Sequence, residues 1–463
     1  MSLLGTGHIV GIVVTLALVS AVGIYAGRKV KSAADFSTGN RSVSPALVAG
    51  TLMGTLVGGA STIGTAQLAF KFGFSAWWFT LGAGMAVAIM GLWMVRPLWE
   101  SAVDTLPQYL VKTYGANIGP VSSVFTSIGI FFNLMAQALA FCALVTSMFP
   151  MQPSLAAVIG LILVLAYVLF GGVWGTGLTG VVKLILLYLA MLACGITAYA
   201  MAGGAEGLMA KLPAHPWFSL FGRGVSKDLA AGFSLIVGVL STQTYFQALS
   251  SAKNVPDARK GALVSALLIP PIGIGGVLVG LYMRINFPDT VSSEVLPVFV
   301  LKFLPPVPAG VVLATLLISV VGTWAGLTLG ISTMVTKDLY QRYISPRGDA
   351  KQVLLVQRGI IVAISLAVLL FVSSNAGSLI LGWSFMSMGL RGCTILLPLL
   401  GAMFFPGRVT PAAGIAAAVL GPLTNFAWKL AFPAGMDPLY PGLLASLLAL
   451  VAISLLTRKN TPA

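Results

Sequence analysis

The chain has 463 residues, of which 58% are hydrophobic and only 8% are charged. Charged residues make up about a quarter of an ordinary soluble domain, so the composition excludes that class and predicts an all-α protein that crosses a membrane many times. The net charge of +15 comes from 26 Lys and Arg against 11 Asp and Glu. Because the basic residues lie in short segments between apolar runs, membrane topology explains the excess and we expect no nucleic-acid partner.

Apolar runs long enough to cross about 30 Å of hydrocarbon recur along the whole chain. We expect thirteen transmembrane helices, at residues 7–26, 44–70, 73–98, 118–148, 153–171, 177–201, 228–250, 261–284, 307–335, 353–374, 376–404, 410–432 and 439–457. Alternate loops carry most of the basic residues, among them Arg28, Lys112, Lys260 and Arg408. These loops should be cytoplasmic. The expectation is a multi-pass protein of the plasma (inner) membrane with its N-terminus outside and its C-terminus in the cytoplasm.

Residues 58–67 (GGASTIGTAQ) interrupt the second apolar run with glycines and hydroxyl side chains. Unwound backbone at membrane depth is tolerated only where it lines a cavity or is buried in protein. The stretch is therefore a candidate binding site. Small residues that let two helices pack closely would produce the same pattern.

The number of runs also predicts an internal repeat. Ten runs form a core at 44–404, in which repeat one covers 44–201 and repeat two covers 228–404. Five crossings reverse orientation, so the repeats are inverted, and binding is expected at the midplane where the first helix of each is broken. The second break should fall at 238–244.

Segments outside this core and several of the loops have their own predictions. Residues 1–43 supply an extra N-terminal helix and a cytoplasmic loop, and residues 405–463 supply two C-terminal helices. The loops at 203–227 and 286–306 contain apolar patches and should form short helices. On the cytoplasmic side, Thr105 and the segment from Val255 should each open a helix.

The chemistry-bearing residues exclude several function classes. His8 and His215 are the only histidines and lie outside the core runs, so no metal centre or catalytic triad is expected. The three cysteines, Cys142, Cys194 and Cys393, each lie in an apolar run without disulfide or zinc-ligand spacing. We expect no enzyme and no organic cofactor. A channel or a membrane sensor is disfavoured because no pore motif repeats and no signalling domain is present.

Short motifs distributed along the chain point to one family. They are LPQYL at 106–110, FGGVW at 170–174, YFQA at 245–248 with ARKG at 258–261, ST at 332–333 with DLY at 338–340, and LPLLG at 397–401. In this order the chain resembles the sodium/solute symporters. The resemblance implies the LeuT-type five-plus-five inverted-repeat fold, with one extra helix before the core and two after it. It also implies ion-coupled symport of a small organic solute by alternating access.

The resemblance implies a sodium site. By alignment, backbone carbonyls at Ala60 and Ile63 and the eighth core helix at Ser319, Gly322 and Thr323 would hold the ion, with Na⁺ expected at Ala60, Ile63, Ser319 and Thr323. Sodium is a hard cation that prefers oxygen ligands, which unwound carbonyls supply. The alternative is that Ser319 and Thr323 bond to carbonyls of their own helix.

Three residues depart from the family pattern around this site. Gly322 replaces a hydroxyl residue, Gly180 stands where the family has an aspartate, and Lys183 follows it. A lysine inside a span costs on the order of 2.5–3.5 kcal/mol on insertion scales and is a functional-site hypothesis. Its ammonium could stand where sodium would bind, so that H⁺ replaces Na⁺ as the coupling ion. The alternative is that Lys183 extends to the cytoplasmic interface.

Polar residues inside spans are the candidates for solute binding, unless they form ordinary interhelical hydrogen bonds. They are Thr62, Gln67, Asn133, Gln137, Gln243, Tyr245 and Arg391. Arg391 lies in the middle of its span, where a guanidinium needs an acceptor, either protein carbonyls or an anionic solute. We therefore expect a carboxylate or an amino acid as substrate, with a neutral solute such as a sugar as the alternative. The partners are this solute and the lipid bilayer, and the oligomeric state is open.

Overall fold

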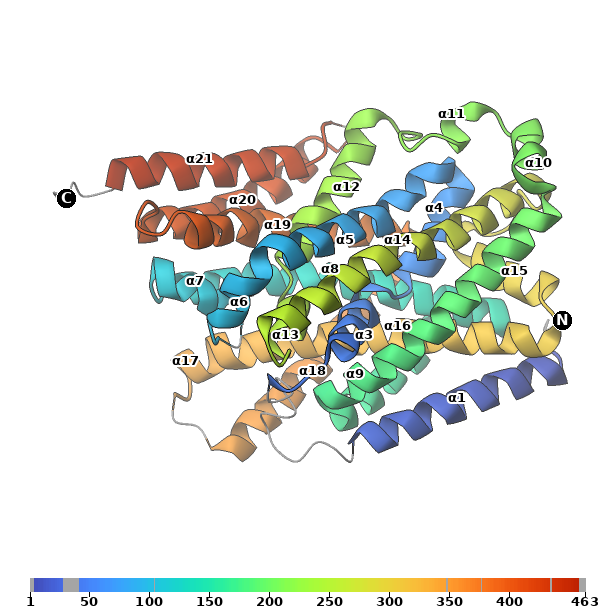
Figure 1. Ribbon diagram of the computed structural model, residues 1–463, viewed down its shortest axis with the longest axis horizontal. Coiled ribbons are helices and arrows are strands. Elements are labelled where there is room, and N and C mark those ends of the chain that lie inside the picture. Colours follow the sequence, from blue (N-terminus) through green and yellow to red (C-terminus); the bar gives the residue numbers. More distant parts are fainter. Residues whose placement is uncertain are drawn as a thin grey trace.

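The structure is a computed structural model that describes residues 4–27, 41–103, 105–346, 349–375, 377–433 and 435–457, with only the backbone described at 23–27, 167–179, 350 and 373. Within these residues the regular secondary structure is helical, apart from one isolated bridge between Val43 and Ala252. Long helices lie side by side along the long axis of the molecule, and α1 begins at the end opposite to that where α21 finishes (Figure 1).

The first part of the chain forms α1 (Thr6–Gly27), α3 (Pro45–Leu56), η2 (Ala60–Gly64), α4 (Thr65–Phe72), η3 (Gly73–Trp77), α5 (Trp78–Ile89), η4 (Met90–Met94), α6 (Val95–Glu100), α7 (Leu106–Tyr114), α8 (Ile118–Met148), α9 (Pro153–Met201), α10 (Gly204–Lys211) and α11 (Ala214–Trp217). The second part forms α12 (Val225–Leu240), α13 (Gln243–Ser250), α14 (Val255–Asn286), η5 (Ser292–Glu294), α15 (Val295–Phe303), α16 (Pro306–Met334), η6 (Val335–Tyr340), α17 (Gln341–Tyr343), α18 (Ala350–Ser374), α19 (Ile380–Phe404), α20 (Pro411–Ala431) and α21 (Leu439–Thr457).

Among the described residues, eight helices are long and apolar enough to cross a membrane, and the bent pair α12–α13 would make a ninth. Apolar helices at Thr6–Val22, Pro45–Leu56 and Pro153–Ala166 are shorter. The runs expected at 153–171 and 177–201 lie in one continuous helix, α9, rather than in two separate helices. The count of thirteen spans and the five-plus-five layout therefore stay predictions.

The break expected in the first core helix is present. Helix α3 ends at Leu56, Val57 is extended, and a π-helix begins at Ala60. Gly58 and Gly59 lie in the turn between them, where a Cβ atom on Gly58 would come within 2.6 Å of the Thr323 hydroxyl and one on Gly59 within 2.4 Å of the Ala140 side chain. The glycines therefore let the unwound segment lie directly against α8 and α16.

The second break is also where it was predicted. Helix α12 ends at Leu240 and α13 begins at Gln243, with a bend of 48° between them. The two residues between the helices, Ser241 and Thr242, are fully buried. Both breaks thus lie inside the protein, as backbone without regular hydrogen bonds requires.

The loop predictions hold for the described segments. Thr105 caps α7 by accepting a hydrogen bond from the Gln108 amide (3.2 Å), and Asn254 caps α14 through the Asp257 amide (2.8 Å). Short helices α10, α11 and α15 occupy the two long loops. The loop at 28–40 lies outside the described residues, as do the side chains of the motif at 170–174.

Candidate functional site

A single lysine lies against the first break. The Lys183 side chain, on α9, is buried, and its Nζ donates to the carbonyl oxygens of Gly54 (2.5 Å) and Ser319 (3.0 Å) and to the Thr323 hydroxyl (3.1 Å). An ammonium group has three N–H donors and no acceptor. All three donors therefore have an oxygen partner from α3 or α16, and the side chain does not extend to the membrane interface.

Glycines allow the lysine to reach this position. A Cβ on Gly180, one turn before Lys183, would lie 2.6 Å from the Gly50 carbonyl oxygen, so α9 and α3 approach as closely as their backbones permit. On the opposite side, a Cβ on Gly322 would lie 3.8 Å from the Lys183 Nζ. Gly180 thus lets α9 approach α3 closely, and Gly322 leaves room for the Lys183 ammonium.

The hydroxyls of α16 turn toward α3 rather than toward their own helix. The Ser319 Oγ donates to the Val57 carbonyl (3.0 Å), and the Thr323 Oγ1 donates to the Gly54 carbonyl (3.3 Å). The Gly54 and Ser319 carbonyls and the Thr323 hydroxyl form a cluster of oxygens around the Lys183 Nζ, next to the Ser319–Val57 hydrogen bond. Such a set of oxygens suits a hard cation, and here it binds the lysine nitrogen.

The α3 end supplies two of these carbonyls, at Gly54 and Val57. The carbonyls expected to hold sodium, at Ala60 and Ile63, lie one to two turns later, and their role as sodium ligands stays a prediction. The chain unwinds before Ala60, and both residues lie in the π-helix that follows, where the Ala60 carbonyl accepts from the Thr65 hydroxyl (3.3 Å). A backbone carbonyl carries no side-chain signal, so only the position of the break could have located it.

A second group of polar side chains connects the first break to α8 and α19. The Gly59 amide donates to the Gln137 side-chain oxygen (2.8 Å), and the Gln137 amide donates to Asn133 (3.4 Å). From α19, the Ser384 hydroxyl donates to the same Asn133 oxygen (3.2 Å). All of these groups are buried.

Arg391 continues this network toward the second break. Its guanidinium donates to the Thr242 hydroxyl (2.6 Å) between α12 and α13, and to the hydroxyl (3.0 Å) and carbonyl (3.2 Å) of Ser387. The Ser387 hydroxyl in turn donates to the Gly129 carbonyl of α8. Arg391 is fully buried, and the groups to which it donates are neutral, so its positive charge is not paired with a carboxylate among the described residues.

Four other predicted residues lie outside this network or at its edge. The Thr62 hydroxyl donates to the Gly58 carbonyl, four residues earlier in the turn before η2 (3.0 Å). Gln67 accepts from the Ile380 amide (3.0 Å) and thereby caps α19, while Gln243 accepts from the Leu106 amide (2.8 Å) of α7. Tyr245 is buried in the first turn of α13. The structure therefore brings together Asn133 and Gln137, packs Arg391 against α8 one turn away at Gly129, and uses Gln67 and Gln243 to join helices.

Sequence reasoning missed Ser384, Ser387 and Thr242. Residues 384, 387 and 391 recur at helical spacing and share one face of α19, a signal that was available in the sequence. For metals, no group of three or more His, Cys, Asp or Glu that could hold an ion lies within the ranges the structure describes.

Comparison with known proteins decides the family. Residues 36–421 match the model of the Sodium:solute symporter family. The chain belongs to the sodium:solute symporter family. It is a membrane transporter rather than an enzyme, as the motifs predicted, and the recognition from those motifs is confirmed.

Individual symporters similar to this chain are distant in sequence. A sodium/glucose cotransporter of Vibrio parahaemolyticus is 24% identical over 395 residues, covering 77% of this chain and 73% of its own. The osmoregulated proline transporter OpuE of Bacillus subtilis (strain 168) is 24% identical over 465 residues, covering 96% and 93%. The solved structure of a Na⁺-coupled sialic acid symporter in a substrate-bound outward-open state superposes with a TM-score of 0.77 at 17% identity, over 99% of this chain and 100% of that one. The structural match supports the symporter fold.

Proposed function

We propose that this chain is a secondary active transporter in which the Lys183 ammonium takes the place of the coupling sodium ion, so that transport of a small organic solute is coupled to H⁺. The observation that carries the proposal is the set of three hydrogen bonds from Lys183 Nζ to Gly54, Ser319 and Thr323. These oxygens come from the last turn of α3, just before the first break, and from α16. The family resemblance assigns the ion to carbonyls just after the same break and to the same helix α16.

Electrostatics oppose a sodium ion at the same place. Two unit charges about 3 Å apart repel by roughly 5 kcal/mol even at an effective dielectric constant of 20. The Ser319 carbonyl and the Thr323 hydroxyl are already engaged by the ammonium. The resemblance implies side-chain oxygens at positions 180 and 322, where this chain has glycines. Coupling by Na⁺ at this cluster is the competing hypothesis, and it would require Lys183 to withdraw.

Proton loss from Lys183 gives a physical link to conformational change. The ammonium holds α3 and α16 together through three donated bonds, whereas a neutral amine has only two N–H donors. Deprotonation removes one bond and the charge that strengthens the others. The contact between the broken helix and α16 is then weaker, which favours the conformation in which they separate.

For the solute we propose a small carboxylate or an amino acid, bound near Asn133, Gln137 and Arg391. Arg391 is buried with neutral partners, so a carboxylate would supply the charge that its surroundings lack. Two of the similar proteins are named for proline and for sialic acid. A neutral sugar is the second candidate, because Asn133 and Gln137 can bond hydroxyl groups and another similar protein is named for glucose.

The number of spans and their orientation in the membrane are part of the same proposal. We assign thirteen spans in a five-plus-five core at 44–404, flanked by 1–43 and 405–463, with the N-terminus outside and the C-terminus in the cytoplasm of the inner membrane. The alternating basic loops support this orientation.

Uptake into proteoliposomes tests the coupling. With a panel of radiolabelled carboxylates and amino acids, an inward proton gradient should drive accumulation and a sodium gradient should not. Lys183→Ala should abolish proton-driven accumulation, while Lys211→Ala, which removes an exposed lysine of α10, should leave it intact. Accumulation that follows the sodium gradient and ignores the proton gradient would contradict the proposal.

A further inference from the structure

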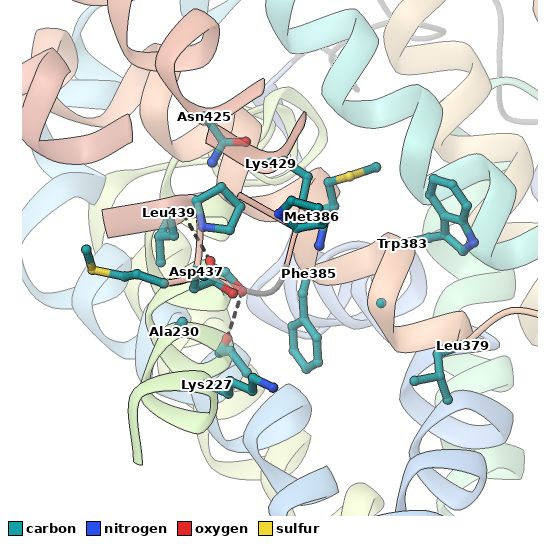
Figure 2. A pocket seen from close by; sticks show the side chains of 18 of the residues that line it. Lys227, Ala230, Leu379, Trp383, Phe385, Met386, Asn425, Lys429, Asp437 and Leu439 are labelled. Carbon is teal, nitrogen blue, oxygen red and sulfur yellow. Dashed lines mark hydrogen bonds between the residues drawn. The ribbon is translucent and has the colours of Figure 1, made fainter. Parts of the chain in front are cut away.

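A cavity of about 500 Å³ lies apart from both breaks, between α12, α19, α20 and the segment that joins α20 to α21. Figure 2 shows Trp383 and Phe385 of α19 around this space, together with Lys227, Lys429 and Asp437. None of its lining residues comes from α3, η2 or α4. The cavity is thus a separate compartment from the cluster at Lys183.

The charges that line the cavity are predominantly positive. They are Arg223, Lys227 and Lys429 against one carboxylate, Asp437. Asp228 neutralises Arg223, because its Oδ1 lies 2.6 Å from the Arg223 guanidinium. The Cζ of Arg223 also lies 5.5 Å from the centre of the Phe385 ring. Lys227 and Lys429 form no ion pair within the part of the chain that the structure describes.

The negative charge of the remaining acid, Asp437, is partly offset by neighbouring groups. Asp437 accepts a hydrogen bond from the Leu439 amide (3.0 Å) and lies near Lys429 and Arg223. Burial raises the pKa of Asp437, while Leu439, Lys429 and Arg223 act in the opposite direction, and Tyr440 is a further titratable neighbour. The cavity therefore offers two unpaired ammonium groups next to apolar walls from Trp383, Phe385 and Phe432.

Helix α19 separates the cavity from the buried polar network. Residues 382, 385, 386 and 389 line the cavity, whereas residues 384, 387 and 391 form the network. At 100° per residue these two sets lie on opposite faces of the helix, and Trp383, which also lines the cavity, lies between them. A solute in the cavity is thus one helix thickness away from Arg391.

From this geometry we infer that the cavity is an accessory binding site for a small organic anion with an apolar body, occupied by the solute before it reaches the network at Arg391. The ammonium groups of Lys227 and Lys429 attract the carboxylate, and Trp383, Phe385 and Phe432 contact the apolar part. The waiting role rests on the proposed anionic solute, whereas the anion site stands on the cavity alone.

Binding to the purified full chain in detergent tests the site, with benzoate as the probe and benzamide as its neutral counterpart. Benzoate should bind more tightly than benzamide, and the difference should shrink as salt screens the charges. Replacing both lysines (Lys227→Gln with Lys429→Gln) should weaken benzoate binding roughly fivefold to tenfold, since pairs between exposed charges contribute only modestly. The matched control, Lys211→Gln with Lys302→Gln, should not.

Two further variants test whether benzoate binds in this cavity. The change in tryptophan fluorescence on benzoate binding should disappear in Trp383→Phe, and Arg391→Gln should leave benzoate affinity unchanged. Loss of binding in Arg391→Gln with normal affinity in the double lysine variant would overturn the accessory site, as would failure of benzoate to bind the wild type. If uptake assays identify a neutral solute while benzoate still binds at the lysines, the anion site stands and its waiting role is overturned.

The carboxylate of Asp437 provides a pH test with benzenesulfonate, a probe that stays charged in acid. Because burial raises the pKa of Asp437, lowering the pH should neutralise it under milder acidity than an exposed aspartate requires, and binding of the sulfonate should become tighter. Asp437→Asn should bind the sulfonate more tightly at pH 7 and should lose most of this pH dependence. A pH profile that is the same in both proteins would contradict the assignment.

Discussion

At the scale of single residues, Lys183 is the side chain on which we propose that the coupling depends. The sequence identified Lys183 as a candidate because an ammonium inside a span is costly, and the structure shows where that group finds its partners. Ser319 and Thr323 could be predicted as well, because their hydroxyls are four residues apart on one helical face. Gly54 and Val57 could not, because their contribution is a carbonyl that every residue has.

We expect that changing a few side chains around the oxygen cluster would make the protein bind sodium. Lys183→Gln combined with Gly322→Ser removes the ammonium and adds a hydroxyl at a position where a Cβ has 3.8 Å of clearance from Nζ. We expect the double variant to gain stability in Na⁺, by about 2.7 kcal/mol at a sodium concentration 100 times its Kd. The measurement is the melting temperature in NaCl against choline chloride.

The wild type should melt at the same temperature in both salts. Lys183→Gln alone should show a smaller response than the double variant, because it lacks the added oxygen. A wild type that is stabilised by NaCl over choline chloride would show that a sodium site exists beside the lysine.

At the scale of helices, both breaks could be predicted. The first follows from glycine and hydroxyl residues inside an apolar run, and the second from the inverted repeat, which places a break in the first helix of each half. The exact position of α9 along α3 could not be predicted, because it depends on how closely the two helices approach at Gly180 and Gly50. The partners of Gln67 and Gln243 were also beyond prediction. Each amide bonds to a helix start distant in sequence, at Ile380 and at Leu106.

A buried acid joins three elements at one end of the molecule. Asp338 in η6 accepts hydrogen bonds from Ser123 of α8 (2.7 Å) and from Thr105 at the start of α7 (3.5 Å). Hydrogen bonds to a charged group contribute about 1.5–3 kcal/mol each. The carboxylate therefore stabilises the arrangement in which α7, α8 and η6 are together.

We expect Asp338→Ala to open this end more often. A cysteine placed at the buried Ser122, whose hydroxyl bonds only within its own helix, reports the opening through its rate of reaction with a maleimide. The rate should rise about tenfold, corresponding to roughly 1.4 kcal/mol, because labelling follows the open population. Asp257→Ala, on the first turn of α14, is the control, and an unchanged rate in Asp338→Ala would refute a closing role.

At the scale of the whole molecule, the all-helical membrane architecture follows from composition, because few other structures can hold so many apolar residues. The division into spans was harder to predict. Residues 60–100 form one helical stretch in which Gly73, with φ of 66°, separates α4 from the segment that follows. Hydropathy detects apolar length but not the direction that the backbone takes at such a residue.

Orientation can be tested by labelling whole cells. Lys211 in α10 and Arg408 between α19 and α20 are both exposed, and the three native cysteines are buried. With single-cysteine substitutions, Lys211→Cys should react with a membrane-impermeant maleimide on intact cells, and Arg408→Cys only after permeabilisation. The reverse pattern would invert the proposed topology.

The lysine at the first break differs from a bound ion in being covalently attached. An ion site fills according to the salt concentration outside the cell, whereas a tethered amine is present at a constant level, and only the pH and the membrane potential can change its state. The amine also cannot leave with the solute, because it stays with α9 when α3 and α16 separate, and only the proton that it binds can be released. A transporter built in this way would respond to acidity and voltage and be indifferent to salinity, which would suit a cell in fresh water as well as one in brine.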